Sequence, residues 1–318
     1  MTPVGGELEQ CCSELLTQQE LQDCSASDEA AVRRERLLAR ALVRSVLAGY
    51  IPGGAHPSSL LFERNPHGKP RLLWPSAARS DHVLSFSLTH TATLIGLAVT
   101  VDGLVGLDVE GSARRTRRDP LRLARRRFSE TEIADLLACP DDDSRAARFL
   151  QLWTLKEAYV KALGRGISAP PGLRSFSFRL SGFPQYRQQQ QQQQQWQSPN
   201  APGGTGSCLP PVQSSTRHST ADGSSSDSSD GSGSRIEFHT LAPDMRHWEF
   251  ALLQPAPDHM AAVCVQRHPS NTRGSRMRGE HEPLQPLCLL HFDATAVLEG
   301  GDGSLLEPQI LAQGSFPC

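Results

Sequence analysis

The sequence predicts an α+β protein of two similar halves, each a helix packed on a mainly antiparallel sheet, with a disordered insertion. In each half, a segment with helical spacing of apolar residues precedes several strand-like segments. Most strand-like segments follow one another without a helix between them, which favours this architecture over alternating βαβ units. Near Gln188 the composition changes to low complexity, which marks the insertion.

The first half is expected at residues 29–112, after an N-terminal extension of residues 1–28. Residues 29–48 carry apolar side chains at helical spacing and are followed by Gly49, which can cap a helix. Turn residues in NPHGKP then precede three strand-like segments, LSFSLTH, LIGLAVTV and LVGLDVE. Asp102-Gly103 separates the last two and predicts that they form a hairpin.

The second half is expected at residues 113–186 and 235–267. Ser129 and Glu132 form a capping-box pattern that opens the helix TEIADLLA. A second helix is expected at about residues 144–163. RSFSFRL, SRIEFHTL and HWEFALLQ alternate as strands do, and MAAVCVQ has the composition of a buried strand.

Residues 187–234 are the expected disordered insertion. It contains an uninterrupted glutamine run from Gln188 to Gln195. The serine- and glycine-rich stretch from Ser198 to Ser234 has no aromatic residue, so it cannot bury enough apolar area to offset the entropy of ordering. Residues 268–318 form a tail of unclear structure, with one apolar run, PLCLLHF.

Bulk composition names no partner class. The formal net charge of −2 gives no overall attraction to nucleic acid. The eight cysteines form no C-x-x-C pair, which favours reduced thiols. The N-terminal residues do not resemble a secretory signal, and no stretch approaches the roughly 20 apolar residues of a membrane span. We therefore expect a cytosolic monomer that binds no membrane, with a plastid or mitochondrion left open.

Two acidic residues in LVGLDVE introduce the candidate site. Strand alternation places Asp108 and Glu110 on the same face as Gly106. Two unit charges about 5 Å apart repel by roughly 3 kcal/mol at an effective dielectric constant near 20, unless a positive group lies nearby. A solvated strand face is the more common explanation of a single D-x-E pattern.

The helix containing WTLKEAYVKALG changes this balance. Glu157 and Lys161 are four residues apart and share a face, with Trp153 one turn earlier and Lys156 beside them. A surface ion pair would contribute only about 0.3–0.5 kcal/mol and needs a solvent-facing helix, yet this helix is apolar over much of its circumference. We therefore expect its charges to face a cleft, where Glu157 and the two strand carboxylates would suit Mg²⁺.

Basic and hydroxyl side chains elsewhere could bind phosphates. Lys69 lies in a glycine turn, and Thr89 and His90 end a strand. The first helix also carries Arg33, Arg34, Arg36, Arg40 and Arg44. Each has an ordinary alternative, such as a loop lysine or a solvated helix face. Together with a Mg²⁺ site, they predict polyphosphate binding.

The ordered motifs resemble those of the Sfp-type 4′-phosphopantetheinyl transferases. The resemblance runs from about residue 33 to residue 180 through NPHGKP, FSLTHT, VGLDVE, RRFSETE, WTLKEAYVKALGRGI and SFSFRL, and more loosely to about residue 265. It implies two similar α+β halves with coenzyme A in the cleft between them. It also implies transfer of phosphopantetheine from coenzyme A to a serine of an apo acyl or peptidyl carrier protein, as in a holo-[acyl-carrier-protein] synthase, with release of adenosine 3′,5′-bisphosphate.

The resemblance assigns roles to individual residues. Asp108, Glu110 and Glu157 become the Mg²⁺ ligands, and Glu157, or water that it holds on the metal, the general base. Lys161 would contact the phosphate under attack and assist the leaving group. The implied coenzyme A contacts are Arg36, Arg40, Lys69, Thr89, His90, Lys156 and Lys161, with His90 at the 3′-phosphate. The register leaves Arg34, Arg36 and Arg40 as alternatives for the helix arginine that helps there.

Carrier proteins of this class are typically acidic, and an arginine-rich segment follows the metal strand. Its members are Arg114, Arg115, Arg117, Arg118, Arg122, Arg125, Arg126 and Arg127. We expect part of this segment to steer the carrier electrostatically. The sequence leaves open whether the carrier serves fatty-acid, polyketide, peptide or aminoadipate chemistry.

Two other functions would also use parts of this sequence. A nucleic-acid-binding protein would use the same arginines but would leave the D-x-E strand and the Glu–Lys helix unexplained. A catalytically silent relative would act as an interaction scaffold through its glutamine-rich insertion. Both are less well supported than the transferase, because all the matched polar positions are present.

Overall fold

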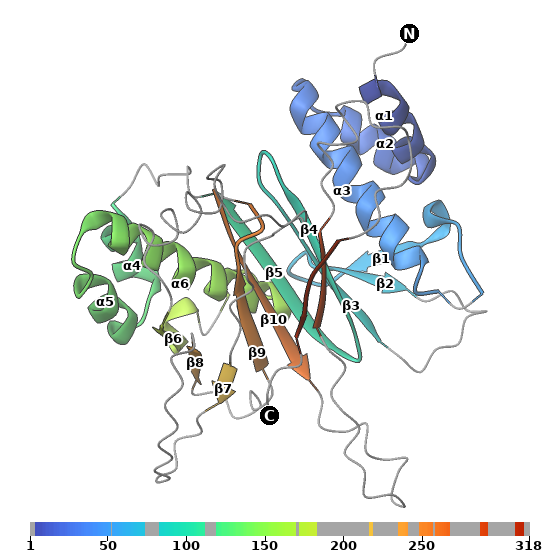
Figure 1. Ribbon diagram of the computed structural model, residues 1–318. Helices are drawn as coiled ribbons and strands as arrows, with labels where there is room; N and C mark the ends of the chain where they lie inside the picture. The colour runs from blue at the N-terminus through green and yellow to red at the C-terminus, as the bar shows by residue number, and fades with distance from the viewer. Residues whose placement is uncertain are drawn as a thin grey trace, which may run out of the picture.

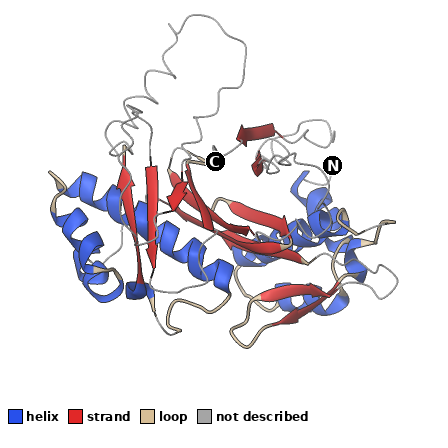
Figure 2. Ribbon diagram, turned by 90° about the horizontal axis from the view of Figure 1, so that it is seen from below, coloured by secondary structure: helices blue, strands red, loops and turns tan. Residues whose placement is uncertain are grey.

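The protein is an α+β structure with several small, mostly antiparallel sheets, as the sequence predicts (Figure 1). The strands gather in the middle of the molecule and helices cover both sides (Figure 2). The computed structural model describes residues 4–51, 53–73, 83–111, 119–169, 172–182, 216–218, 235–240, 248–256, 258–267, 287–291 and 309–314.

Three helices form the N-terminal part of the protein. Helices α1 (Val4–Glu14) and α2 (Gln18–Ser25) pack against α3 (Ala30–Ala48), which confirms the helix expected at residues 29–48. Buried side chains at the contact are Cys12, Leu16, Cys24, Leu37 and Ala41. The helices of residues 1–28 are not predicted above, although Thr17 and Glu20 form the capping box that opens α2.

Helix α3 also packs on a two-stranded sheet. This sheet pairs β3 (Leu84–His90) with β4 (Ile95–Val101) in antiparallel register. A separate hairpin joins β1 (Leu61–Arg64) to β2 (Pro70–Leu73), after the short 3-10 helix η1 (Pro57–Ser59). The shared core includes Leu47, Leu60, Leu84 and Phe86.

One long helix, α6 (Asp142–Leu163), is central to the rest of the described chain. It packs on β5 (Gly103–Gly111) and β10 (His259–Arg267), which belong to a three-stranded sheet completed by β9 (Trp248–Leu253). Helices α4 (Pro120–Arg127) and α5 (Glu130–Leu137) lie against α6. The capping box at Ser129 and the left-handed Gly164 after α6 confirm the predicted helix ends.

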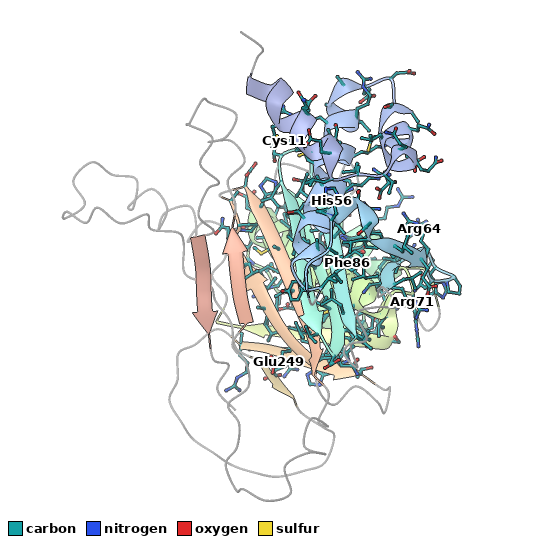
Figure 3. All side chains as sticks on the ribbon, turned by 90° about the vertical axis from the view of Figure 1, so that its right-hand side faces the viewer. Cys11, His56, Arg64, Arg71, Phe86 and Glu249 are labelled. Atoms are coloured by element: carbon teal, nitrogen blue, oxygen red, sulfur yellow. The ribbon has the colours of Figure 1, made fainter. Side chains whose placement is uncertain are left out.

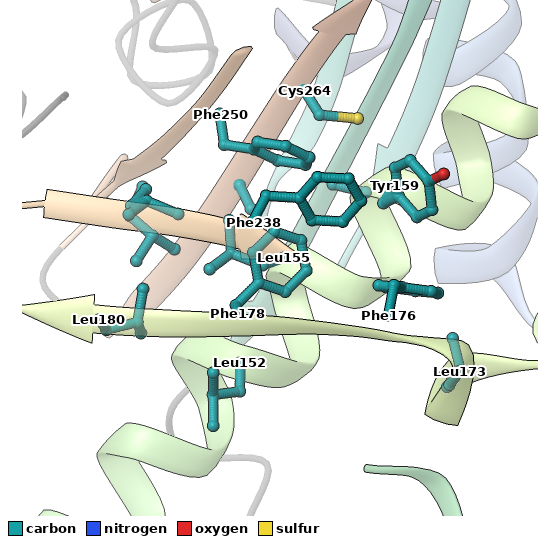
Figure 4. Close-up of a cluster of buried hydrophobic side chains, with 14 of the residues drawn as sticks. Leu152, Leu155, Tyr159, Leu173, Phe176, Phe178, Leu180, Phe238, Phe250 and Cys264 are labelled. Atoms are coloured by element: carbon teal, nitrogen blue, oxygen red, sulfur yellow. The ribbon is translucent and has the colours of Figure 1, made fainter. Parts of the chain in front are cut away.

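An aromatic core joins α6 to two further strands. Strands β6 (Phe176–Ser181) and β8 (Arg235–Thr240) pair in antiparallel register. The short 3-10 helix η2 (Leu173–Ser175) directly precedes β6. The Tyr159 ring lies 4.6–5.1 Å, centroid to centroid, from the rings of Phe176, Phe238 and Trp248 (Figure 4 shows the first two with Tyr159). This packing fixes α6 along its buried face.

The predicted hairpin across Asp102-Gly103 is wrong. The turn exists, with Asp102 at a φ of 56°, but β4 pairs with β3 while β5 pairs with β10. The other edge of β5 faces β3, where side-chain hydroxyls replace a backbone ladder. Ser87 Oγ accepts from the Leu107 amide at 3.0 Å, and Thr89 Oγ1 accepts from the Val109 amide at 3.3 Å. This seam brings the end of β3 beside Asp108.

The remaining described strands lie in or beyond the predicted insertion. Strand β7 (Thr216–His218) pairs in parallel with β8, and β11 (Leu287–His291) pairs with β12 (Gln309–Gly314). The glutamine run, the rest of residues 187–234, and Arg114, Arg115, Arg117 and Arg118 lie outside the described residues. None of the described helices is long and apolar enough to cross a membrane.

Candidate active site

Gly106 lets β5 and α6 approach each other closely. A Cβ built on Gly106 would lie 2.6 Å from the amide nitrogen of Ala162 and closer still to the carbonyl oxygen of Ala158. No side chain fits at that separation, so the contact requires glycine. The close approach places Asp108, two residues further along the same strand face, opposite the last turns of α6.

Asp108 and Lys161 form the centre of the candidate site. Lys161 Nζ lies 2.6 Å from Asp108 Oδ1 and donates to Thr89 Oγ1 at 3.1 Å. Asp108 is only 4% exposed, which excludes the solvated strand face as its explanation. Its second oxygen, Oδ2, is buried and has no hydrogen-bond partner among the described residues. A buried carboxylate oxygen of this kind is costly unless a further donor or cation reaches it.

Glu157 and Glu110 lie in the same electrostatic environment. Burial raises the pKa of the Glu157 carboxyl to about 7; the charges of Asp108 and Glu110 raise it further, whereas Lys161 lowers it. Trp153 Nε1 donates to Glu110 Oε1 at 3.2 Å, which explains the tryptophan one turn before Glu157. The three carboxylates predicted from the sequence therefore act on one another, although they come from two elements.

These donors fit a hard divalent cation in their chemistry. Three carboxylates with a buried, unpartnered Asp108 oxygen are the ligand type that Mg²⁺ prefers. Within the described part of the chain, however, no three His, Cys, Asp or Glu side chains are already arranged as a metal site. Lys161 engages Asp108 and Trp153 engages Glu110 instead. The assignment of these residues as Mg²⁺ ligands therefore stays a prediction.

The anion-binding candidates on α3 are engaged mainly with the N-terminal helices. Arg36 donates to the Asp23 carbonyl at 3.3 Å, and Arg40 donates to Cys24 Sγ at 3.5 Å. The half-exposed His90 ring lies at the end of β3, with Nδ1 2.8 Å from Glu35 Oε1. Their contacts to coenzyme A stay predictions.

Lys69 is held by main-chain carbonyls. Its Nζ donates to the carbonyls of Lys161 at 2.6 Å, Ala162 at 3.1 Å and Val105 at 3.1 Å. Burial lowers the pKa of Lys69 to about 8, against a smaller opposing effect of Cys264. A lysine has three protons to donate, and all three have acceptors here.

Lys156 is a correction to the predicted set of coenzyme A contacts. Its side chain is fully buried, and Nζ lies 2.9 Å from Glu132 Oε2 and donates to the Leu173 and Phe176 carbonyls, each at 2.8 Å. Burial lowers its pKa, while Glu132 opposes that shift. An ammonium with no exposed surface cannot touch a ligand, so Lys156 belongs to the core instead.

His259 is a polar residue near the site that sequence analysis missed. It is 5% exposed; Nδ1 lies 2.7 Å from Asp258 Oδ1, and Nε2 lies 3.0 Å from Thr91 Oγ1 and 3.2 Å from Thr93 Oγ1. It thereby holds the turn that follows β3. No local pattern could have shown this, because the partners are separated by more than 160 residues.

Known proteins resemble this part of the chain. Residues 104–203, which include β5 and α6, match a family model described as the 4′-phosphopantetheinyl transferase superfamily. The chain is 36% identical over 136 residues to 4′-phosphopantetheinyl transferase HetI of Nostoc sp., covering 43% of this chain and 54% of the relative. It is 34% identical over 144 residues to 4′-phosphopantetheinyl transferase Sfp of Bacillus subtilis, covering 45% and 57%.

A third relative matches to a similar extent. It is the L-aminoadipate-semialdehyde dehydrogenase-phosphopantetheinyl transferase of Eremothecium gossypii, 33% identical over 150 residues, with coverage of 45% of this chain and 52% of the relative. The matches thus span about half the length of the curated relatives.

Proposed function

The chain belongs to the Sfp-type 4′-phosphopantetheinyl transferase family, and from this premise we propose that it transfers phosphopantetheine from coenzyme A to a serine of an apo carrier protein. Adenosine 3′,5′-bisphosphate would be released. The observation that carries the proposal is the meeting of Asp108, Lys161 and Glu157 on β5 and α6, inside the segment that matches the family.

Lys161 is the proposed electrostatic partner of the reacting phosphate. Its ammonium is anchored between Asp108 and Thr89, so its position is set before a ligand arrives. Transfer of a phosphoryl-linked group depends mainly on positioning and on neutralising charge on the transferring and leaving phosphates. A cation fixed on α6 supplies part of that neutralisation.

Asp108, Glu110 and Glu157 are the proposed holders of Mg²⁺. When bound, the cation would polarise the phosphate oxygens that accumulate negative charge. Glu157 is also the proposed general base for the carrier serine. A carboxylate is a suitable base when it lies within hydrogen-bond reach of the hydroxyl, and Glu157 lies beside the other reacting groups.

The remaining partners follow from the same proposal. Arg36, Arg40 and His90 are proposed contacts to the phosphates of coenzyme A. Thr89, which is 3% exposed, holds the Lys161 ammonium by accepting a hydrogen bond at Oγ1. We also propose that the two α+β parts are similar halves with coenzyme A between them, and that the enzyme is a cytosolic monomer that binds neither membrane nor nucleic acid.

The carrier is proposed to approach along α4. Arg125 and Arg126 are exposed there, whereas Arg127 donates to the Ile167 carbonyl at 3.5 Å. Acyl and peptidyl carriers of fatty-acid, polyketide and peptide synthesis are candidates, and the name of the Eremothecium relative adds an aminoadipate-type carrier. Holo-[acyl-carrier-protein] synthase activity is one outcome within this proposal.

The proposal is tested by incubating the full chain with coenzyme A, Mg²⁺ and each apo carrier. Intact-mass spectrometry should show one phosphopantetheine added to the carrier, and peptide mapping should place it on serine. The Glu157→Gln variant should lose turnover. Absence of transfer to every carrier class, with coenzyme A bound or not, would reject the proposed activity and favour a scaffold role.

A further inference from the structure

The β1–β2 hairpin reaches across the molecule to the C-terminal end of α6. Asn65 Nδ2 donates to the Gly164 carbonyl at 2.8 Å, and Lys69 Nζ donates to the carbonyls of Lys161 and Ala162. These contacts join residues more than 90 positions apart in the chain. Main-chain atoms close the hairpin, since the Asn65 amide donates to the Lys69 carbonyl at 2.9 Å. Asn65 Nδ2 and Lys69 Nζ are therefore available to bind the end of the helix.

The turn is built to present Lys69. Asn65 Oδ1 accepts from the amides of His67 and Lys69, both at 2.9 Å, and Gly68 adopts a φ of +89°. An asparagine that bonds the following backbone and a glycine with positive φ are the usual means of fixing a tight turn. The lysine therefore leaves the hairpin from a defined main-chain position.

The end of α6 is suited to receive it. The last carbonyls of a helix lack intrahelical partners, and the helix dipole favours a cation there. Gly164 has a φ of +64°, and a Cβ at this position would lie 2.8 Å from Lys69 Cδ and 2.9 Å from Asn65 Nδ2. The third acceptor, the Val105 carbonyl at 3.1 Å, belongs to the strand that carries Asp108. One ammonium thus bridges both elements of the site.

We propose that Lys69 is a positioning residue that holds the main chain of Lys161 and β5 in register, so that the Lys161 ammonium meets Asp108 and Thr89. This inference rests on the proposed transferase function, because it assigns a part in that reaction. It replaces the expected direct contact between Lys69 and coenzyme A. Lys69 fixes the main chain of α6 at Lys161 and of β5 at Val105, three residues before Asp108. This restricts the position of the Lys161 ammonium that would neutralise the reacting phosphate.

The two roles of Lys69 predict different kinetic changes. A positioning residue acts on turnover, because a displacement of about 1 Å at reacting groups can cost about 100-fold in rate. A residue that binds coenzyme A in the ground state acts on affinity. Lys69→Met keeps most of the length of the unbranched side chain and removes its charge. Arg71→Met is the matched control, since Arg71 lies on the same hairpin (Figure 3). Its side chain is 69% exposed and forms an ion pair with Glu63.

The experiment measures coenzyme A affinity by calorimetry, kcat and KM by carrier modification, and amide hydrogen exchange over residues 155–166. Lys69→Met should lower kcat by about 10- to 100-fold, leave coenzyme A affinity within about twofold, and speed exchange at the end of α6. Arg71→Met should change none of these. Weaker coenzyme A binding with unchanged kcat at saturation would overturn the proposal, as would unchanged kcat in folded Lys69→Met.

Two arms keep the test decisive. If Lys69→Met does not fold, Asn65→Ala removes only one bond of the clamp and should give smaller changes in the same direction; unchanged exchange and kcat in this variant overturn the proposal. If the wild type transfers nothing, the transferase function fails. The exchange measurement then still decides whether Lys69 holds the end of α6.

Discussion

Lys161 Nζ lies 2.6 Å from Asp108 Oδ1 and thereby joins the last turn of α6 to the middle of β5. The pair leaves the second oxygen of Asp108 buried and unpartnered among the described residues. The Lys161 ammonium therefore binds one of the two carboxylate oxygens of Asp108, and the other oxygen could still accept a hydrogen bond or bind a cation. This incomplete satisfaction is the structural basis for expecting a second positive group at the site.

Replacing Asp108 by Asn should weaken the binding of that second cation while leaving the fold intact. Asp108→Asn keeps the side-chain shape but removes the charge, so we expect transferase activity to fall by about 100-fold or more. Mg²⁺ should raise the melting temperature of the wild type and have less effect on the variant. Glu130→Gln, at an 84% exposed side chain on α5, is the control and should behave as the wild type. An equal Mg²⁺-induced shift in Asp108→Asn would contradict the metal assignment.

Gly106→Ala should disturb the site without touching any of its polar groups. The new methyl would overlap the main chain of α6 at Ala158 and Ala162, and backbone cannot move aside as a flexible side chain does. We expect a loss of about 3 kcal/mol or more in unfolding free energy, measured by urea denaturation, and a fall in kcat of the folded fraction. Gly49→Ala, at a helical φ of −65°, is the control and should be tolerated. A fully stable Gly106→Ala would show that β5 and α6 are not in close contact.

The buried Lys156–Glu132 pair should matter far more than the exposed pair near it. Both side chains are 0% exposed, and Glu132 also accepts from the amides of Ser129 and Phe178. Lys156→Met would leave a buried carboxylate without its cation, so unfolding free energy should fall by about 3–5 kcal/mol. Arg174→Met breaks the solvent-exposed pair with Glu130 and should change it by about 1 kcal/mol at most. Similar losses in the two variants would rule out this explanation of Lys156.

Adjacent residues on α6 show where sequence reasoning succeeds and fails. The capping box at Ser129, the glycine after the helix and the strand alternation are local signals, and the structure confirms the elements they predict. Local spacing cannot tell whether Lys156 or Glu157 faces the candidate site, because many residues around α6 are buried. That choice depends on Glu132, Leu173 and Phe176, which no spacing within the helix reveals.

Strand pairing failed for the same reason. Asp102-Gly103 correctly predicts a turn, but the partner of β5 is β10, which pairs Asp108 with Ala262 across more than 150 residues. A turn signal predicts where the chain reverses direction, but it does not predict which strand pairs with each edge of β5. The role of Lys69 is likewise non-local, because the glycine turn that displays it says nothing of the helix end that receives it.

The Lys69 ammonium should give stability a specific pH dependence. Its pKa falls from 10.5 to about 8 on folding, so between these values the unfolded chain holds a proton that the folded chain has lost. Unfolding free energy attributable to this group therefore rises with pH through that window and is flat below it. In urea denaturation, the wild type should gain stability relative to Lys69→Met between pH 8 and 9. The Cys264 thiol, whose pKa is raised by burial, is present in both proteins and acts in the opposite direction above about pH 9. A constant difference between the two proteins would show that Lys69 stays protonated throughout.

Electrostatic steering by α4 should appear as a salt-dependent effect on the carrier alone. Arg125 and Arg126 are exposed in the last turn of this helix, so the double variant Arg125→Glu/Arg126→Glu presents the opposite charge to an acidic carrier. We expect the carrier KM to rise by about 10-fold or more at low salt, with coenzyme A affinity unchanged, because rim charges act mainly on encounter. Arg71→Glu, on the β1–β2 hairpin, is the control for added negative charge.

The salt dependence distinguishes steering from damage to the site. The Debye length shortens from about 10 Å at 0.1 M salt to about 3 Å at 1 M, so long-range attraction is largely screened at high salt. The difference in carrier KM between wild type and double variant should therefore shrink as salt rises, while kcat stays equal throughout. If the KM difference persists at 1 M salt, the two arginines make direct contacts or support the fold. If KM is unchanged even at low salt, the carrier does not approach along α4.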